Sequence, residues 1–100
     1  MNLSSLTDMD RMIHEPARLV IVTILNTAEQ VDFLFLQRET GLTKGNLSFH
    51  LTKLEEAGYI SIEKTYRGRV PLTLISLTEK GRKAFEVYRK QLAQLIEKMK

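Results

Sequence analysis

Apolar residues recur every three or four positions along most of this 100-residue chain, which is the spacing of one face of an α-helix. The first run predicts a short amphipathic helix over residues 1–13 that packs against another element; its apolar positions are Leu3, Leu6, Met9, Met12 and Ile13. A second helix is predicted from Pro16, because the missing N–H of proline needs no partner at the first helical position. Residues 17–27 are apolar on nearly every side, so we expect this helix to be the buried centre of the fold.

Two further helices are predicted on either side of a three-residue connection. Asp32 can cap a helix that begins at residue 33 and that Gly41 would end in a left-handed conformation. Thr43 can cap the next helix, over residues 44–57, which Gly58 closes. The buried side of this helix is marked by apolar residues four and three positions apart, Leu47, Leu51 and Leu54. A short connection that contains glycine, here Gly41-Leu42-Thr43, is typical of a helix-turn-helix unit.

The apolar period changes to two beyond residue 58. Residues 59–66 and 72–77 alternate between two faces and predict two strands. Between them Arg67-Gly68-Arg69 form a basic hairpin tip, and Pro71 is tolerated where the second strand begins at an edge. The helical period returns over residues 79–99, which would make a rod of roughly 30 Å. The predicted fold is therefore mainly α, of the α+β class: a winged helix-turn-helix with a two-stranded β-wing and additional N- and C-terminal helices.

The composition fits one soluble domain over residues 1–100 and excludes several kinds of site. Hydrophobic residues make up 43% of the chain and charged residues 27%, which is enough apolar surface for a core. The chain contains no cysteine, which excludes disulfides, thiolate nucleophiles and zinc sites built on sulfur. The longest uncharged apolar stretch, residues 19–28, is half of the roughly twenty residues that a membrane helix needs. The first ten residues carry two acids and no base, unlike a secretory signal, so we expect a cytoplasmic protein without a membrane partner.

Positive charge is concentrated in the second half of the chain. Residues 1–42 carry three basic and six acidic side chains, residues 43–70 carry five and three, and residues 71–100 carry seven and three. The net charge is therefore −3, +2 and +4 in these three segments. A basic surplus favours a polyanionic partner, because each phosphate neutralised by Lys or Arg releases a condensed counterion. A solvated, lysine-rich helix face explains the C-terminal surplus equally well.

The helix predicted over residues 44–57 presents small, polar and cationic side chains away from its leucines. On a helical wheel the outward positions are Gly45, Phe49, Thr52 and Lys53, flanked by Asn46, Ser48 and His50. The major groove of B-DNA admits one helix, whose N-terminal residues reach the base edges, and short side chains let the backbone come close. We therefore predict DNA contacts from Thr43, Lys44, Gly45, Asn46, Ser48, Phe49, His50, Thr52 and Lys53.

Two of these residues, and the hairpin tip, allow more than one interpretation. Phe49 has no core to enter; it can press on a thymine methyl group, or contact a neighbouring element or a partner protein. His50 fits a hydrogen-bond donor to phosphate or backbone better than a metal ligand, because no acidic companions lie at ligand spacing. Arg67 and Arg69 can enter a narrow minor groove or bind phosphates, and a solvated turn is the alternative.

Nothing in the sequence predicts catalysis, a metal site or a cofactor. A catalytic site would need a nucleophile with a base, or a cluster of perturbed acids. The two histidines, His14 and His50, lie far apart in the sequence, and no Ser or Asp partners stand at a recognisable spacing. We expect a protein that is not an enzyme and that binds no metal ion or cofactor.

Several segments together resemble a family of regulators. The stretch from Leu42 to Ile60 resembles the recognition segment of winged-helix bacterial and archaeal regulators related to MarR and ArsR. Three shorter segments match as well. The start of the first core helix in these families resembles His14-Glu15-Pro16-Ala17-Arg18-Leu19. The exit from their wing resembles Pro71-Leu72-Thr73, and the start of their last helix resembles Leu77-Thr78-Glu79-Lys80-Gly81. The resemblance covers residues 13–90 and is closest to compact members of the group. It implies a homodimeric transcription factor with residues 43–53 in the major groove and residues 67–69 at the minor groove.

The chain departs from some members of these families. It has no cysteine pair and no cluster of His and Asp on a terminal helix, which argues against a metal response. It also lacks the longer helices that frame a drug pocket in larger relatives. The sequence therefore leaves open whether a small-molecule effector exists.

The residues themselves also support a dimer. The last predicted helix carries a wider apolar stripe than the edge of one small domain needs, and the N-terminal helix can pack beside it. We predict that the terminal helices, residues 1–13 and 79–99, form a homodimer interface through Leu3, Leu6, Met9, Phe85, Tyr88, Leu92, Leu95, Ile96 and Met99. The alternative is that the last helix folds back on its own domain. A two-fold dimer would recognise an inverted repeat with half-sites about one helical turn apart.

These observations predict a sequence-specific, double-stranded DNA-binding transcriptional regulator, most simply a repressor that blocks access to a promoter. The alternative is a winged-helix protein-interaction module without sequence-specific DNA binding, because a fold alone does not settle function. The outward position of Phe49 favours this alternative slightly. Salt separates the two, since a protein that contacts about six phosphates loses affinity steeply as salt rises, whereas an apolar protein contact does not.

Overall fold

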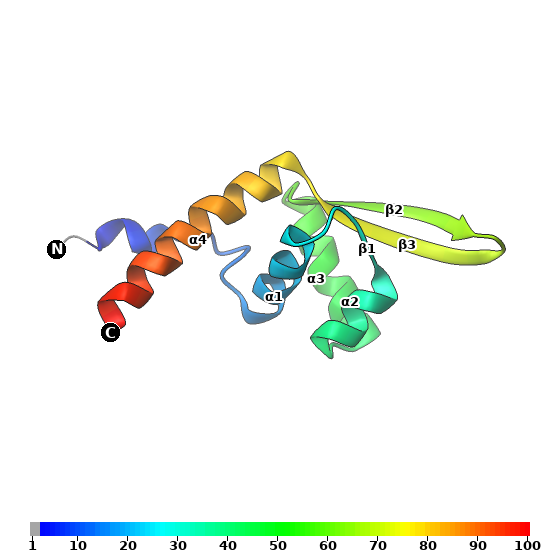
Figure 1. Ribbon diagram of the computed structural model, residues 1–100, viewed down its shortest axis with the longest axis horizontal. Helices are drawn as coiled ribbons and strands as arrows, with labels where there is room; N and C mark the ends of the chain where they lie inside the picture. Colours follow the sequence, from blue (N-terminus) through cyan, green and yellow to red (C-terminus); the bar gives the residue numbers. More distant parts are fainter. Residues whose placement is uncertain (1–2) are drawn as a thin grey trace.

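Three short helices pack around a small antiparallel sheet, and a long C-terminal helix and a long hairpin extend from them in opposite directions (Figure 1). The computed structural model describes residues 3–100, so the first two positions of the expected N-terminal helix lie outside the described residues. The molecule measures 57 × 25 × 21 Å along its principal axes. The elements in chain order are the 3-10 helix η1 (Ser4–Asp8), α1 (Pro16–Asn26), β1 (Val31–Asp32), α2 (Phe33–Thr40), α3 (Lys44–Glu56), β2 (Ile60–Arg67), β3 (Val70–Leu77) and α4 (Glu79–Met99).

The predicted starts of α1, α2 and α3 and the predicted end of α2 are confirmed. Pro16 is the first residue of α1. The side chain of Asp32 caps α2 by accepting a hydrogen bond at 2.8 Å from the backbone N–H three residues later. Thr43 caps α3 in the same way at 3.1 Å. Gly41 has a left-handed backbone with a φ of 71°, which turns the chain from α2 into α3.

The predicted N-terminal helix over residues 1–13 forms only in part. Only the single 3-10 turn η1 forms, and the chain then turns at Asp10. The Asp10 Oδ1 atom accepts hydrogen bonds from the backbone N–H groups of Met12 at 2.9 Å and Ile13 at 3.2 Å. An aspartate that satisfies backbone donors in this way competes with helix formation. The apolar spacing nevertheless identified buried positions, because Leu6, Met9 and Ile13 all pack inside the structure.

A third, short strand joins the predicted two-stranded wing. The sheet is antiparallel with the strand order β1-β3-β2. β1 contains only Val31 and Asp32, which pair with Ile75 and Leu74 of β3. Two residues carry too little alternation to predict a strand, and their pairing depends on a segment far along the chain. This strand could therefore not be read from the sequence.

The wing itself is longer than predicted. β2 and β3 pair over their full eight residues, so Arg67 lies opposite Val70, and only Gly68 and Arg69 form the connecting loop. Gly68 has a φ of 63°, as a two-residue hairpin loop requires. Pro71 lies beyond the end of β1, where one edge of β3 is free and the missing N–H of proline is tolerated.

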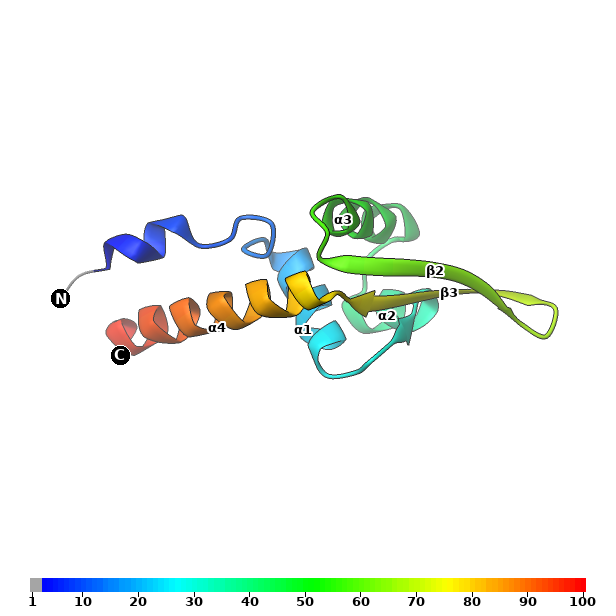
Figure 2. The same ribbon diagram turned by 90° about the horizontal axis from the view of Figure 1, so that it is seen from above.

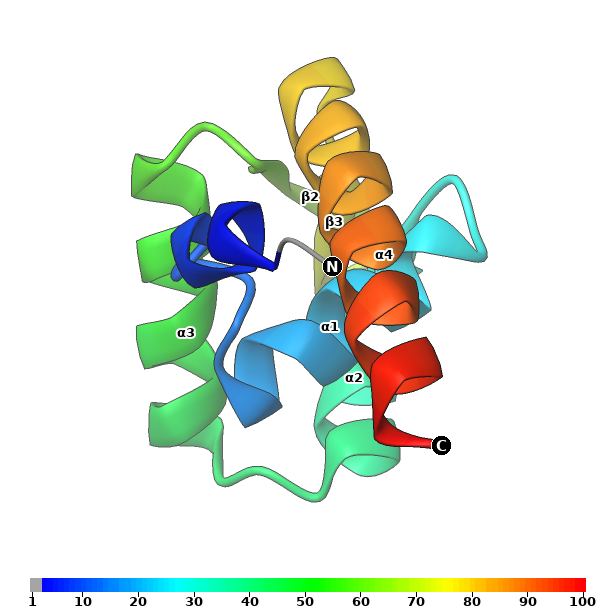
Figure 3. The same ribbon diagram turned by 90° about the vertical axis from the view of Figure 1, so that its left-hand side faces the viewer.

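One hydrophobic core joins the three short helices, the sheet and the start of α4. Its most deeply buried side chains are Ile13, Ile21, Val22, Leu25, Leu36, Leu47, Leu54, Ile75 and Tyr88. α1 supplies three of these, which confirms it as the central helix, and Figure 3 shows α3 and α4 on opposite sides of it. Among residues 3–100 no helix is both long enough and apolar enough to cross a membrane.

Contacts at the first turn of α4 fix the direction in which this helix leaves the core. The backbone N–H of Thr78 donates to the carbonyl oxygen of Tyr59 at 3.0 Å, and the Thr78 hydroxyl donates to the carbonyl oxygen of Gly58 at 2.6 Å. A Cβ on Gly81 would lie 2.1 Å from the Tyr59 carbonyl oxygen, so only glycine lets α4 start this close to β2. Further along, η1 runs beside the C-terminal half of α4 (Figure 2).

Candidate nucleic-acid interface

α3 presents a polar face to solvent, as its periodicity predicted. The three leucines that mark its inner side are buried in the core: Leu47, Leu51 and Leu54. The four residues predicted to point outward are exposed: Gly45, Phe49, Thr52 and Lys53. Four more of the predicted contact residues, at the start of the helix, are exposed as well: Thr43, Lys44, Asn46 and Ser48. Short polar and cationic side chains thus line the free side of α3.

Gly45 has no structural reason within the chain to be glycine. A Cβ at this position would meet no atom within 4 Å, and the backbone is not left-handed. Glycine inside a helix costs about 1 kcal/mol relative to alanine. The bare backbone in the first turn of α3 is therefore a place where another molecule can approach closely.

Phe49 stands on the outside of α3 and is 54% exposed. Its ring packs edge-on against the ring of His50, with the centroids 5.3 Å apart. The ammonium nitrogen of Lys53, one turn further on, lies 5.5 Å from the centroid of the same ring. These neighbours hold an aromatic surface and a positive charge side by side at the outer edge of the helix. Contact with a thymine methyl group and contact with a partner protein both stay predictions.

His50 differs from the other predicted contacts, because α1 partly covers it. Its Nδ1 atom lies 3.1 Å from Nη1 of Arg18 and 4.0 Å from Oε1 of Glu15. Arg18 is held in turn by its Nε–H, which donates to the carbonyl oxygen of Met12 at 2.6 Å. The periodicity of α3 could not reveal this anchor, because it comes from another helix. Within the described part of the chain, no three His, Asp or Glu side chains are grouped so that they could hold a metal ion.

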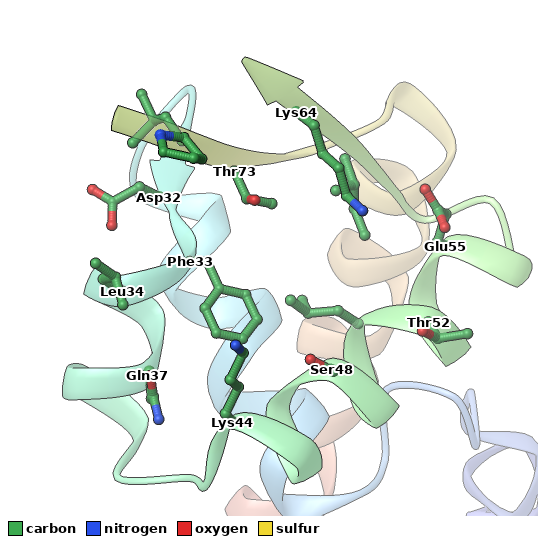
Figure 4. A pocket seen from close by; sticks show the side chains of 14 residues that line it. Asp32, Phe33, Leu34, Gln37, Lys44, Ser48, Thr52, Glu55, Lys64 and Thr73 are labelled. Carbon is green, nitrogen blue, oxygen red and sulfur yellow. The ribbon is translucent and has the colours of Figure 1, made fainter. Parts of the chain in front are cut away.

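A groove of about 910 Å³ lies between α2, α3 and the wing. Figure 4 shows Lys44 and Ser48 of α3 on one side of it and Lys64 and Thr73 of the wing on the other. Its apolar lining includes Phe33, Leu51, Ile62 and Leu72, and two carboxylates lie at its margins, Asp32 and Glu55. Polar and cationic groups from two separate elements therefore meet along one open channel.

Two wing residues that the sequence analysis missed lie on the face that borders this groove. The strand register places Lys64 opposite Thr73 and Tyr66 opposite Pro71, on the same face as the buried Ile75. Tyr66 is 69% exposed, so its ring extends this face toward the tip of the wing. The alternation across residues 59–66 contained the signal, because every second residue from position 60 shares one face.

The predicted basic tip is exposed, and its two arginines occupy different positions. Arg67 is the last residue of β2 and lies opposite Val70, on the other face from Tyr66, whereas Arg69 lies in the loop. In residues 3–100 neither guanidinium has an ion pair or a hydrogen-bond partner. Both are therefore free to bind an anion.

Two tyrosines tie the segment before α1 to the rest of the molecule. The Tyr59 hydroxyl donates to Oδ2 of Asp10. Burial, then this hydrogen bond and the negative charge of Asp10, raise the pKa of Tyr59 to about 12. The hydroxyl of Tyr88 lies 2.7 Å from Nδ1 of His14, and burial raises the pKa of Tyr88 as well. The segment is thus attached both to the α3–β2 connection and to α4.

The residues predicted for a dimer interface divide into three groups. Four are buried in the core of this chain, which by itself explains their apolar character: Leu6, Met9, Phe85 and Tyr88. Three are half-buried: Leu3, Leu92 and Leu95. Two are exposed on α4, together with Val87, which the predicted stripe did not include: Ile96 and Met99. The first part of α4 therefore packs on its own domain, and the C-terminal end of its apolar stripe, at Ile96 and Met99, remains exposed. The dimer interface stays a prediction.

Comparison with known proteins identifies similar sequences along most of the chain. A family model described as a winged helix DNA-binding domain matches residues 17–96. An uncharacterized protein of Methanocaldococcus jannaschii is 38% identical over 86 residues, which cover 85% of this chain and 92% of that protein.

Solved structures share the architecture. The structure of a transcriptional regulator homologue from Pyrococcus horikoshii OT3 is 26% identical, with a TM-score of 0.87 over 97% of this chain and 95% of the other. A MarR-family protein from Porphyromonas gingivalis W83 is 20% identical, with a TM-score of 0.69 over 87% and 84% of the two chains. An ArsR-family regulator is 16% identical, with a TM-score of 0.59 over 97% and 95%. The last two likenesses concern the fold alone, and they confirm the predicted winged helix.

Proposed function

Because the chain belongs to the winged helix DNA-binding domain family, we propose that it binds double-stranded DNA with sequence specificity and regulates transcription, most simply as a repressor. The observation that carries this proposal is the exposed polar and cationic face of α3 beside a basic wing. Regulators with this fold are generally non-enzymatic, and no catalytic step belongs to the proposal.

The first turns of α3 have the size and chemistry of a helix that reads the major groove. A helix with its side chains is about 10–12 Å across, and the major groove is about 12 Å wide. Asn46 and Ser48 are exposed and can bond to base edges, while the open backbone at Gly45 allows close approach. Lys44 and Lys53 are exposed cations that can bind the neighbouring phosphates.

The groove between α3 and the wing fits one strand of the DNA backbone. A strand that leaves the major groove beside α3 would pass between Lys44 and Lys64, which approach this channel from opposite sides. Tyr66 lies on the same face of the wing, further out. Arg67 and Arg69 would then bind phosphates or enter the minor groove at the tip. One continuous backbone path therefore joins the two predicted sets of contacts.

The proposed regulator acts as a homodimer formed through the C-terminal end of the apolar stripe of α4, which extends past the core of its own chain. Ile96 and Met99 continue the stripe of the buried Phe85 and Tyr88 and are 45% and 70% exposed, and large exposed apolar side chains that lie close together mark an interaction site. A two-fold axis through this contact would present two copies of α3 to one duplex. The expected site is an inverted repeat with half-sites about one helical turn apart.

A protein-interaction module is the second candidate function, and one observation favours it. Phe49 exposes 54% of its surface on the outer face of α3, and phenylalanine is enriched in protein interfaces. Salt dependence distinguishes the two functions. A DNA-binding chain that contacts about six phosphates should lose roughly 10³-fold in affinity between 50 and 200 mM salt, whereas an apolar protein contact should hardly change.

The proposal is tested by selecting duplexes from a random DNA pool with the full chain at moderate salt, followed by sequencing. We expect enrichment of an inverted repeat. A chain with Arg67→Ala and Arg69→Ala serves as the matched control, because α3 is intact and the same repeat should be enriched more weakly. Binding without enrichment would contradict sequence specificity and point to an architectural role. No binding by the unaltered chain would contradict the proposal and favour the protein-interaction module.

A further inference from the structure

A side chain of α1 reaches the flank of α3. Nη1 of Arg18 lies 3.1 Å from Nδ1 of His50. The Nε–H of Arg18 donates to the carbonyl oxygen of Met12 at 2.6 Å, and its backbone N–H donates to Oε1 of Glu15 at 2.8 Å. The bond to Met12 holds the guanidinium beside His50, so Arg18 can fix the position of the imidazole ring.

The chemistry of this contact determines which nitrogen of His50 carries the proton. A guanidinium donates hydrogen bonds, accepts none and stays protonated. Nδ1 of His50 must therefore accept from Arg18, and in the neutral ring the proton is on Nε2. The carboxylate of Glu15, 4.0 Å from the same Nδ1, favours the opposite tautomer, in which Nδ1 donates. Arg18 decides between the two.

The second ring nitrogen of His50 is available to another molecule. No side-chain or backbone atom of residues 3–100 is hydrogen-bonded to Nε2, and no buried side-chain nitrogen in this range lacks a partner, so Nε2 retains some contact with solvent although the His50 side chain is only 15% exposed. The ring lies on the flank of α3 that faces α1, and not on the outermost line occupied by Phe49. The flank of a helix inside the major groove faces the sugar-phosphate wall, where hydrogen bonds position the protein without reading sequence.

We propose that Arg18 is a positioning residue for DNA binding: it holds His50 as a neutral ring whose Nε2–H donates to a backbone phosphate oxygen. This inference rests on the proposed DNA-binding function. It adds to the interface a residue of α1 that acts only through His50. Such a bond would fix the register of α3 along the duplex.

NMR measures the tautomer of His50 directly, in the absence of DNA, through long-range ¹H–¹⁵N correlations. The measurement is made at mildly alkaline pH, because a tautomer is defined only for the neutral ring. We expect the Nε2–H form in the unaltered chain and a shift toward the Nδ1–H form in Arg18→Met, where Glu15 is the remaining neighbour. Arg11→Met is the matched control, because it removes an equal charge from an exposed residue near α1. An unchanged His50 spectrum in Arg18→Met would overturn the positioning role.

DNA affinity supplies the second measurement. We expect Arg18→Met to weaken binding about 3- to 10-fold beyond the effect of Arg11→Met, which corresponds to one oriented hydrogen bond. In a His50→Gln background the side-chain amide N–H replaces Nε2–H and has no tautomer for Arg18 to select. In that background Arg18→Met should therefore lower DNA affinity no more than Arg11→Met does. The loss should be equal for a selected and a scrambled duplex, because phosphates carry no sequence information. Equal losses in both backgrounds, or a loss confined to the selected duplex, would overturn the proposal.

A further comparison leaves Arg18 in place and so remains informative if Arg18→Met does not fold. His50→Gln keeps a donor near the position of Nε2, whereas His50→Asn places its amide near that of Nδ1. We expect His50→Gln to retain the affinity within about two-fold and His50→Asn to lose about 3- to 10-fold. Equal affinities of the two variants would overturn the donor role of Nε2. Failure of the unaltered chain to bind any duplex would instead contradict the proposed function, on which the tautomer measurement does not depend.

Discussion

Replacement of Gly81 by alanine tests the packing that sets the direction of α4. The alanine Cβ would lie 2.1 Å from the carbonyl oxygen of Tyr59, 2.9 Å from its carbonyl carbon and 3.0 Å from its Cα. All three atoms belong to the backbone, and the oxygen also accepts a hydrogen bond from Thr78 at 3.0 Å, so no side-chain rotation relieves the overlap. The start of α4 must therefore move by roughly 1 Å or more, because non-bonded heavy atoms rest about 3.5 Å apart.

The expected loss of stability combines two opposing effects. Forcing extra atoms into a packed site typically costs about 1–3 kcal/mol, and an overlap with backbone belongs near the upper value. Alanine stabilises a helix by about 1 kcal/mol relative to glycine, which offsets part of this cost. The net loss of about 2 kcal/mol should lower the Tm of a domain of this size by about 8–16 °C.

Thermal unfolding followed by circular dichroism measures this effect, at one protein concentration because the Tm of a dimer depends on concentration. Gly45→Ala is the matched control: the same change in a helix, at a position where a Cβ meets no atom within 4 Å. It should raise the Tm by about 4–8 °C. A Tm for Gly81→Ala equal to that of the unaltered chain, or raised as in the control, would refute the packing argument.

Four further outcomes test the interface and the fold. Asn46→Ala or Ser48→Ala should change the preferred DNA sequence in a repeated selection, by about 1–3 kcal/mol for a contacted base pair. Arg67→Ala or Arg69→Ala should weaken binding to most duplexes and reduce the salt slope by about 1; unchanged affinity after loss of both arginines would contradict the role of the wing. Truncation after Leu92 removes the exposed Ile96 and Met99 and should convert a dimer to a monomer in sedimentation velocity, and an unaltered mass would contradict the dimer. The folded chain holds the Tyr59 proton more tightly than the unfolded chain, so this contribution to stability is complete below pH 10 and is lost as the pH rises toward 12. Tyr59→Phe should therefore flatten the fall in unfolding free energy over that range in urea titrations, and an equally steep fall would count against the hydrogen bond to Asp10.

Signals that lie within a few residues of each other determined the local architecture. Asp32 and Thr43 cap helices with side chains that reach a backbone N–H only three residues away, and Gly41 needs no partner to adopt its left-handed backbone. The sequence therefore predicted α2, α3 and their connection. The faces of α3 followed as well, because a helix with a known start has a known orientation of each side chain, and Leu47 is buried and Lys53 exposed as the wheel predicted.

Interactions between distant segments were decided by the tertiary structure alone. β1 is a strand because β3 lies beside it, and a pattern of only two residues cannot predict this pairing. Arg18 reaches Nδ1 of His50 from 32 residues away, so the α3 sequence could place this ring on a flank but could not say that one nitrogen is already bonded. Lys64 lines the groove, and Tyr66 shares its face of the wing, only because β2 packs beside α3.

The apolar stripe of α4 shows the physical reason most clearly. Phe85, Tyr88, Ile96 and Met99 recur at the same helical spacing, and in the sequence they are equivalent. The hydrophobic effect favours burial of all four but has no direction. The spacing therefore predicts that these residues tend to be covered, but it does not predict which element or molecule covers them. In the structure the first two fill the core of their own chain, and the last two remain on the surface. The sequence determined α1–α4 and their faces; packing determined which part of the apolar stripe of α4 was left exposed.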